Sequence, residues 1–97
     1  MYDILNMKKF NWNSEKNIEL KKSRNISFED VLFYLERNLI IDIVENPNQD
    51  RYPGQKYYII EINYYIYYIP FIENDEEVFL KTIIPSRKYK RIYSGGE

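Results

Sequence analysis

Apolar residues follow a helical spacing in one segment of the chain. Four of them stand at positions i, i+3, i+4 and i+7 and form one stripe: Phe28, Val31, Leu32 and Leu35. Ser27 precedes this stripe, and Asp30 stands three positions after Ser27, as in a capping box. The pattern predicts a helix that begins after Ser27 and closes at Arg37 and Asn38.

A more polar helix is predicted before it. Lys9–Trp12 can form a short first strand, after which Asn13 or Ser14 can cap a helix that runs to about residue 23. Asn25 suits the turn at the C-terminal end of this helix, because asparagine tolerates a positive φ.

β-branched and aromatic residues dominate the second half of the chain, as is typical of strands. We expect strands over 39–44, 55–62, 65–71 and 78–84, with a loop rich in turn residues at 46–54. A two-residue turn at Asn63 and Tyr64 pairs Ile62 with Tyr65. Tyr64 is a poor choice where φ is positive, so a register shifted by one residue stays open.

The hairpin formed by 55–62 and 65–71 is apolar on both faces, which predicts a central pair of strands covered on both sides. In the last strand we expect four residues to share one face: Val78, Leu80, Thr82 and Ile84. Lys81 then points to the other face. Pro85 ends the strand, and Ser86 caps a short basic helix.

The expected order of elements is β-α-α-β-β-β-β-α. Helices grouped at the front and antiparallel strands behind them predict an α+β fold. We therefore expect residues 1–97 to form a single domain, in which two N-terminal helices pack on a four- to five-stranded antiparallel sheet and a short C-terminal helix follows.

Composition limits the chemistry that this chain can perform. It contains no Cys and no His, which excludes thiolate metal sites, disulfides and nucleophile pairs that use His. The acidic turn at 73–77 lacks the Gly and the ligand spacing of a calcium loop, and the three Gly form no phosphate loop. We expect no metal and no cofactor, so chemistry falls to Lys, Arg, Tyr and carboxylates.

The N-terminal residues 1–9 lack the order of a signal peptide, and no apolar run is long enough to cross a bilayer. A cytoplasmic location without a membrane partner is expected. Six of the eleven Tyr stand among residues 57–68, where they could stack on bases. The preference of aromatic residues for strands favours a role in the core instead, with Tyr64 as the most exposed of the six.

Residues 78–93 carry five Lys or Arg and no Asp or Glu, although the net charge of the chain is only −1. Such a segment attracts phosphates, and it also fits an ordinary solvated helix; both interpretations stay open. The best candidate site is the group Lys81, Arg87 and Lys88. Cations in the first turn of a helix are unfavourable unless an anion binds there.

Three motifs give the chain a resemblance to a known family. They are Phe10-x-Trp12-Asn13-x-x-Lys16-Asn17, then Ile26-Ser27-Phe28-Glu29-Asp30-Val31, and last Ile83-Ile84-Pro85-Ser86-Arg87-Lys88. In this order and spacing they resemble BrnT-type toxins of bacterial toxin–antitoxin systems, over nearly the whole chain. The resemblance implies a RelE-like ribonuclease fold, growth arrest by RNA cleavage, and inhibition by a small ribbon-helix-helix DNA-binding antitoxin.

The resemblance also suggests site residues. It places the family's closing Arg-Lys on Arg87 and Lys88 and its helical Lys on Lys16. Together with Lys81, which the strand pattern puts beside them, we expect Arg87 and Lys88 to be the catalytic group, without a metal. We expect Lys16, Lys90, Arg91 and Tyr89 to contact RNA, including mRNA on the ribosome. Three departures from the family pattern stand at Asn13, at Ser23-Arg24-Asn25 and at Pro85-Ser86, in place of Asp, Lys-His-Gly and Ser-Ala.

A ribonuclease without His remains chemically possible. Arg87 could stabilise the phosphorane, Lys81 or Lys88 could serve as the base, and Tyr89 or Tyr93 could supply a proton. Two alternatives stay open: a non-catalytic member of the same superfamily that binds a protein such as gyrase or persists as an inactive partner, and a small RNA-binding module.

Overall fold

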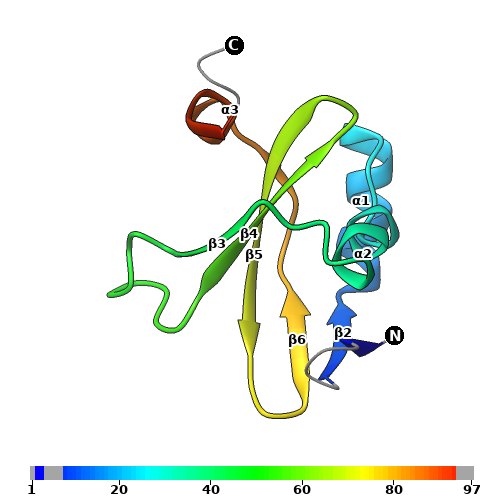
Figure 1. Cartoon of the computed structure of the whole chain (residues 1–97). Coiled ribbons are helices and arrows are strands. Elements are labelled where there is room, and N and C mark those ends of the chain that lie inside the picture. The colour runs from blue at the N-terminus through cyan, green and yellow to red at the C-terminus, as the bar shows by residue number, and fades with distance from the viewer. Residues whose placement is uncertain (1, 4–7, 94–97) are drawn as a thin grey trace.

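The computed structural model of the chain describes residues 2–3 and 8–93, with strands and helices intermixed along them (Figure 1). In chain order the elements are β1 (Tyr2–Asp3), β2 (Lys8–Trp12), α1 (Ser14–Arg24), α2 (Phe28–Glu36), β3 (Asp42–Glu45), β4 (Lys56–Ile62), β5 (Tyr65–Glu73), β6 (Glu77–Leu80), β7 (Ile84–Pro85) and α3 (Arg87–Tyr93). The predicted α+β class is confirmed.

The strands form one mixed sheet, so the expectation of a four- to five-stranded antiparallel sheet was wrong. Over the described residues the sheet has seven strands in the order β1-β2-β6-β5-β4-β3, and β7 pairs with β5. β2 runs parallel to β6, with Phe10 beside Val78. The reason is topological: the chain leaves β2 through two helices and returns to it much later in the same direction, a pairing that no local pattern encodes.

The β4–β5 hairpin has the predicted register. Ile62 pairs with Tyr65 and Ile60 with Tyr67, so the shifted alternative is excluded. Asn63 and Tyr64 make the turn with φ of 52° and 70°. Two positive φ values give a turn whose twist suits the flanking strands, and that gain outweighs the poor fit of Tyr64.

The two faces of the hairpin hold two separate apolar clusters, as the sequence predicted. The larger cluster gathers residues of α1, α2, β2, β4, β5 and β6, with Phe28, Val31 and Leu80 fully buried in it. The smaller cluster consists of Ile59, Ile66 and Tyr89, packed by further tyrosines. Accordingly, α1 and α2 cover one face of the sheet, whereas α3 lies across the other (Figure 1).

Both long helices begin at the predicted caps. The Asn13 side chain accepts from the amide of Lys16, and Ser27 and Asp30 form the reciprocal capping box. Buried Asn17 then joins the helices, because its Oδ1 accepts from the amide of Phe28 at 2.8 Å. Its Nδ2 donates to Glu29 at 2.8 Å, and this hydrogen bond is the main reason why the pKa of Glu29 is lowered.

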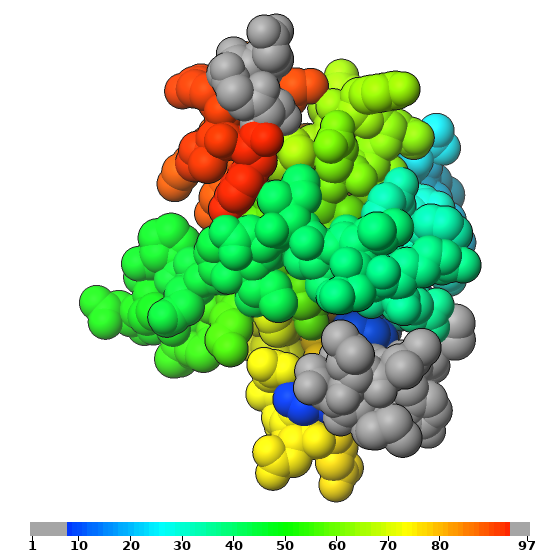
Figure 2. All heavy atoms as spheres, viewed as in Figure 1, coloured from blue at the N-terminus to red at the C-terminus, as the bar shows by residue number. Residues whose placement is uncertain are grey.

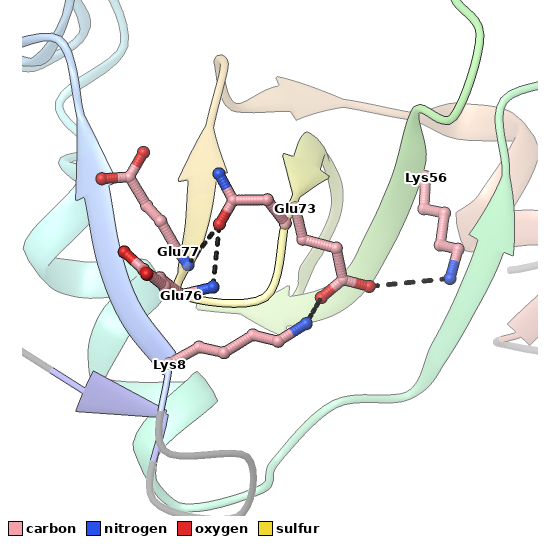
Figure 3. Close-up of polar contacts among 6 residues, drawn as sticks. Lys8, Lys56, Glu73, Glu76 and Glu77 are labelled. Carbon is pink, nitrogen blue, oxygen red and sulfur yellow. Dashed lines mark hydrogen bonds and ion pairs between the residues drawn. The ribbon is translucent and has the colours of Figure 1, made fainter.

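The acidic segment closes the end of the sheet farthest from α3 (Figure 1). Asn74 Oδ1 accepts from the amides of Glu76 and Glu77, which shapes the turn between β5 and β6. Figure 3 shows Lys8 and Lys56 reaching Glu73 from two different strands, at 2.9 and 3.7 Å. Such partly exposed ion pairs add little stability, so their main effect is to neutralise one carboxylate of an acidic turn.

The last strand is interrupted, which corrects the expected continuous strand over 78–84. β6 ends at Leu80, the amide of Lys81 donates to Pro70 O at 2.8 Å, and pairing resumes at Ile84, opposite Tyr68. Within the gap Ile83 is fully buried, while Thr82 is only half-buried. The alternation therefore shifts by one residue, and Thr82 and Ile84 join the side of Lys81 rather than that of Leu80.

The turn at Tyr64 gives a stability prediction. Tyr64 is 84% exposed and has a positive φ, a conformation that costs a non-Gly residue about 1–2 kcal/mol. Glycine removes that cost but is more flexible when unfolded, by about 0.5–1 kcal/mol. Tyr64→Gly should therefore raise the free energy of unfolding by up to about 1 kcal/mol in urea denaturation. Tyr65→Gly, at the first position of β5, should lower the free energy of unfolding, and a loss in both variants would contradict this account.

Candidate nucleic-acid interface

Helix α3 is held against the sheet by its one buried residue. Tyr89 is 8% exposed, and its ring makes an edge contact with Tyr68, with 5.7 Å between the ring centroids. Before the helix, the amide of Ser86 donates to Ile66 O, and Ser86 Oγ accepts from the amide of Tyr89. The predicted Ser86 cap is thus present, and the helix is tied to β5 at its first turn.

The cations of α3 occupy the remaining sides of the helix. Arg87, Lys88 and Arg91 are exposed, and Lys90 is half-buried with its ammonium donating to Tyr64 O at 2.9 Å. Within the part of the chain that the structure describes, no carboxylate forms an ion pair with any of these four. Their charge is therefore not neutralised by the protein and is available to an anionic ligand.

The three expected catalytic residues do not share one cavity. Lys81 lines a groove with Thr82 and Ile84, whereas Arg87 lines a second hollow of about 270 Å³ with Pro85 and Lys90. β7 separates the two hollows, since its first residue lines one and its second residue the other. Lys88 lines neither and lies beside the ring of Tyr89 at 5.5 Å.

Two of the expected RNA contacts lie apart from this surface. Lys16 lies in the first turn of α1, on the opposite face of the sheet, where its ammonium is 3.4 Å from Glu19. Tyr89 is buried, so its ring is a packing element of α3 and offers no free face to a base. The sequence shows its aromatic character but not its orientation, because a helix of seven residues holds too few apolar positions to define a stripe.

A polar contact that the sequence did not reveal ties the end of α3 to β3. The Tyr93 hydroxyl donates to Asp42 Oδ2 at 2.6 Å, which raises the pKa of Tyr93 to about 12. The same hydrogen bond is the main cause of a lowered pKa at Asp42. Figure 2 shows α3, in red, resting on the segment that leads through β3. The sequence offered one indication of this contact: Asp42 is a charged residue within a run of β-branched residues that are typical of a strand.

The groove beside Lys81 has an aromatic wall that sequence reasoning also missed. It has a volume of about 360 Å³, and Tyr57 and Tyr68 lie in it with ring centroids 4.7 Å apart. Burial is the main cause of a raised pKa at Tyr57, whose hydroxyl therefore stays protonated well above neutral pH. Tyr52 and Gln55, which precede β4, also line the groove, as do Asn46 and Pro70.

Further features restrict the kind of site. No three carboxylates in the described ranges gather into a group that could hold a metal ion. Among the helices over the same residues, none is long and apolar enough to span a bilayer.

Comparisons with protein-family models, with curated proteins and with solved structures found no match for this chain.

The Tyr93–Asp42 contact predicts a pH-dependent stability. It requires ionised Asp42 and protonated Tyr93, so its contribution is present between about pH 4 and pH 10, the ordinary pKa values of Asp and Tyr. It is lost as the pH falls through the lowered pKa of Asp42, or rises through the raised pKa of Tyr93. Tyr93→Phe should lower the melting temperature at pH 7 more than at pH 3. Tyr65→Phe, which changes an exposed tyrosine on β5, serves as the control and should leave the melting temperature unchanged at both pH values. An equal loss of melting temperature at pH 7 and pH 3 in Tyr93→Phe would refute the contact.

Proposed function

We propose that this protein is a toxin-like ribonuclease with a RelE-like fold, acting in the cytoplasm and neutralised by a cognate antitoxin. Three things support the proposal: the resemblance of the motifs to BrnT-type toxins, an α+β fold with two N-terminal helices and a basic C-terminal helix, and the surface of α3. The observation that carries most weight is the set of α3 cations with no carboxylate partner among the described residues.

The proposed reaction is attack of a ribose 2′-hydroxyl on its own phosphate. The 2′ oxygen forms a bond to phosphorus, the 5′ oxygen leaves, and the products are a 2′,3′-cyclic phosphate and a 5′-hydroxyl. Arg87 is exposed and can offer two N–H groups to the phosphorane oxygens, where charge develops. Lys81 or Lys88 takes the proton of the 2′-hydroxyl.

The tyrosines of α3 are poor candidates for the second proton transfer. The Tyr93 proton is held by Asp42, and the pKa of Tyr89 is raised, mainly by burial. The proton of the leaving 5′ oxygen must then come from a lysine or from water. Because Lys81 and Arg87 line separate hollows, the phosphate has to lie across β7 to meet both.

Arg87→Ala tests the catalytic surface. Loss of a charged donor to the transition state should lower the rate of RNA cleavage about 10²–10³-fold, with an unchanged melting curve because Arg87 is exposed. The measurement is cleavage of total RNA by purified protein, with and without ribosomes. Lys22→Ala removes an exposed cation of α1 on the other face of the sheet and should cleave as the wild type does. Cleavage by Arg87→Ala at the wild-type rate would show that the proposed centre is wrong.

Substitutions at Lys81 separate a base from a positive anchor in the same assay. Arginine keeps the charge but does not give up its proton at accessible pH. If Lys81 is the base, both Lys81→Ala and Lys81→Arg lose activity; if it only holds a phosphate, Lys81→Arg retains most of it.

A non-catalytic binding function is the second candidate, because both tyrosines of α3 are already held by contacts within the protein. With Tyr89 packed and Tyr93 bonded to Asp42, the surface has cations for binding but only lysines for proton transfer. A non-catalytic protein that binds RNA or a protein target therefore remains the second candidate. Absence of cleavage by the wild type, with and without ribosomes, would favour it.

The antitoxin of the proposed system should cover the α3 surface with an acidic or amphipathic segment. Opposite charge would speed association and keep RNA from the same cations. A triple charge reversal at Arg87, Lys88 and Arg91 should weaken binding of the product of the neighbouring gene and reduce its dependence on salt. An unchanged dissociation constant in the triple variant would place the antitoxin elsewhere, and the matched control is reversal of Lys21 and Lys22 on α1.

A further inference from the structure

We propose that the groove beside the 46–54 loop binds one unpaired base of single-stranded RNA. The inference rests on the proposed action on RNA and deepens it by assigning a base-binding site distinct from the cations of α3. It depends on four properties of the groove: its aromatic wall, its rigid rim, its charge and its size.

Aromatic rings form the floor and the rim of the groove. Tyr57 and Tyr68 are half-buried and form the floor, with their rings tilted by 42° to each other. Tyr52 stands at the rim with 40% of its surface exposed. Rings held in this way offer a base a surface on which to stack, and stacking accepts any base because each has a π face.

The rim is held in one conformation by its own hydrogen bonds. Asn46 is buried; its Nδ2 donates to Gln55 Oε1 at 2.7 Å, and its Oδ1 accepts from the amide of Asn48. Gln49 Nε2 donates to Asn46 O and to Gln55 O, while its Oε1 accepts from the amide of Gly54. Figures 1 and 2 show this loop projecting from the body of the protein. A loop that is already ordered by its own side-chain hydrogen bonds loses little conformational freedom when a ligand binds.

The charge around the groove suits a nucleotide. Among the described residues that line it, Lys81 is the one charged side chain, and none is a carboxylate. The Arg51 guanidinium lies 5.5 Å from the ring centroid of Tyr52, on the same rim. A base on the rings would therefore have cations near its phosphates, and Lys81 would join the groove to the α3 surface beyond β7.

The volume of the groove, and the need for an accessible base face, favour one unpaired base over a duplex as the ligand. The groove, at about 360 Å³, is near the lower end of the roughly 300–1,000 Å³ of small-ligand pockets. A paired base cannot present its face to a ring, because it is stacked between its neighbours in the helix. The ligand is thus an unpaired nucleotide, as found in single-stranded RNA.

The experiment uses RNA that cannot be cleaved, so that it does not depend on the ribonuclease activity. The probes are fluorescein-labelled 2′-O-methyl hexanucleotides, one of uridines and one with abasic residues at the same six positions. Fluorescence anisotropy gives dissociation constants for the wild type, Tyr52→Ala, Tyr52→Phe and Tyr64→Ala. The Tyr52 side chain is 40% exposed and takes no part in the hydrogen bonds that order the loop, and Tyr64 is an exposed tyrosine at the far hairpin turn.

The wild type should bind the uridine probe more tightly than the abasic probe. Tyr52→Ala should weaken binding of the uridine probe about tenfold, as for loss of a stacking residue, and leave the abasic probe unchanged. Tyr52→Phe keeps the ring and should bind like the wild type, as should Tyr64→Ala.

The inference is overturned if Tyr52→Ala binds both probes as the wild type does, or if the wild type binds neither. The two proposals fail separately. If the protein cleaves RNA but Tyr52→Ala binds the uridine probe as the wild type does, the base site is wrong and the ribonuclease proposal stands. If binding depends on Tyr52 but no RNA is cleaved, the base site stands and the ribonuclease proposal is wrong.

Discussion

The burial of the β4–β5 hairpin on both of its faces is the constraint on which the rest of the structure depends. Its residues alternate between the two clusters, so that Tyr58 and Ile60 face α1 and α2 while Tyr57 and Ile59 face the other side. A pair of strands with two apolar faces must be covered twice. The two N-terminal helices pack on one face, whereas the second face is covered by α3, which has only seven residues. The groove lies on this second face.

The interruption between β6 and β7 connects this constraint to the candidate site. The break lets Ile83 enter the larger cluster, and it turns Lys81, Thr82 and Ile84 toward the groove. β7 is then short, and it delivers the chain to Ser86, whose amide is anchored on Ile66 O. A regular strand to residue 84 would have directed Thr82 and Ile84 to the core side instead. The shift of register thus gives the groove three of its lining residues, Lys81, Thr82 and Ile84.

Features set by neighbouring residues could be predicted from the sequence, and features set by distant ones could not. The caps at Asn13 and Ser27 and the register of Ile62 with Tyr65 were all correct, because each depends on residues only a few positions apart. The parallel pairing of Phe10 with Val78 joins segments that are far apart in the sequence, and no pattern of residues near either position predicts it. For the same reason the cations of α3 were identified from the sequence, whereas the aromatic groove, assembled from a loop and three strands, was not.

The net charge of this protein does not describe the field at either end of the sheet. The net charge is −1, yet the acidic turn between β5 and β6 lies at the opposite end of the sheet from α3 (Figure 1). Charges are screened over about 8 Å at physiological salt, whereas the molecule is 38 Å in its longest dimension. The acidic turn therefore cannot cancel the field of Arg87, Lys88 and Arg91, and a polyanion meets a basic surface despite the slightly acidic composition. Lys8 and Lys56 pair with Glu73 at the acidic end, whereas none of the ion pairs of the described residues involves Arg87, Lys88 or Arg91.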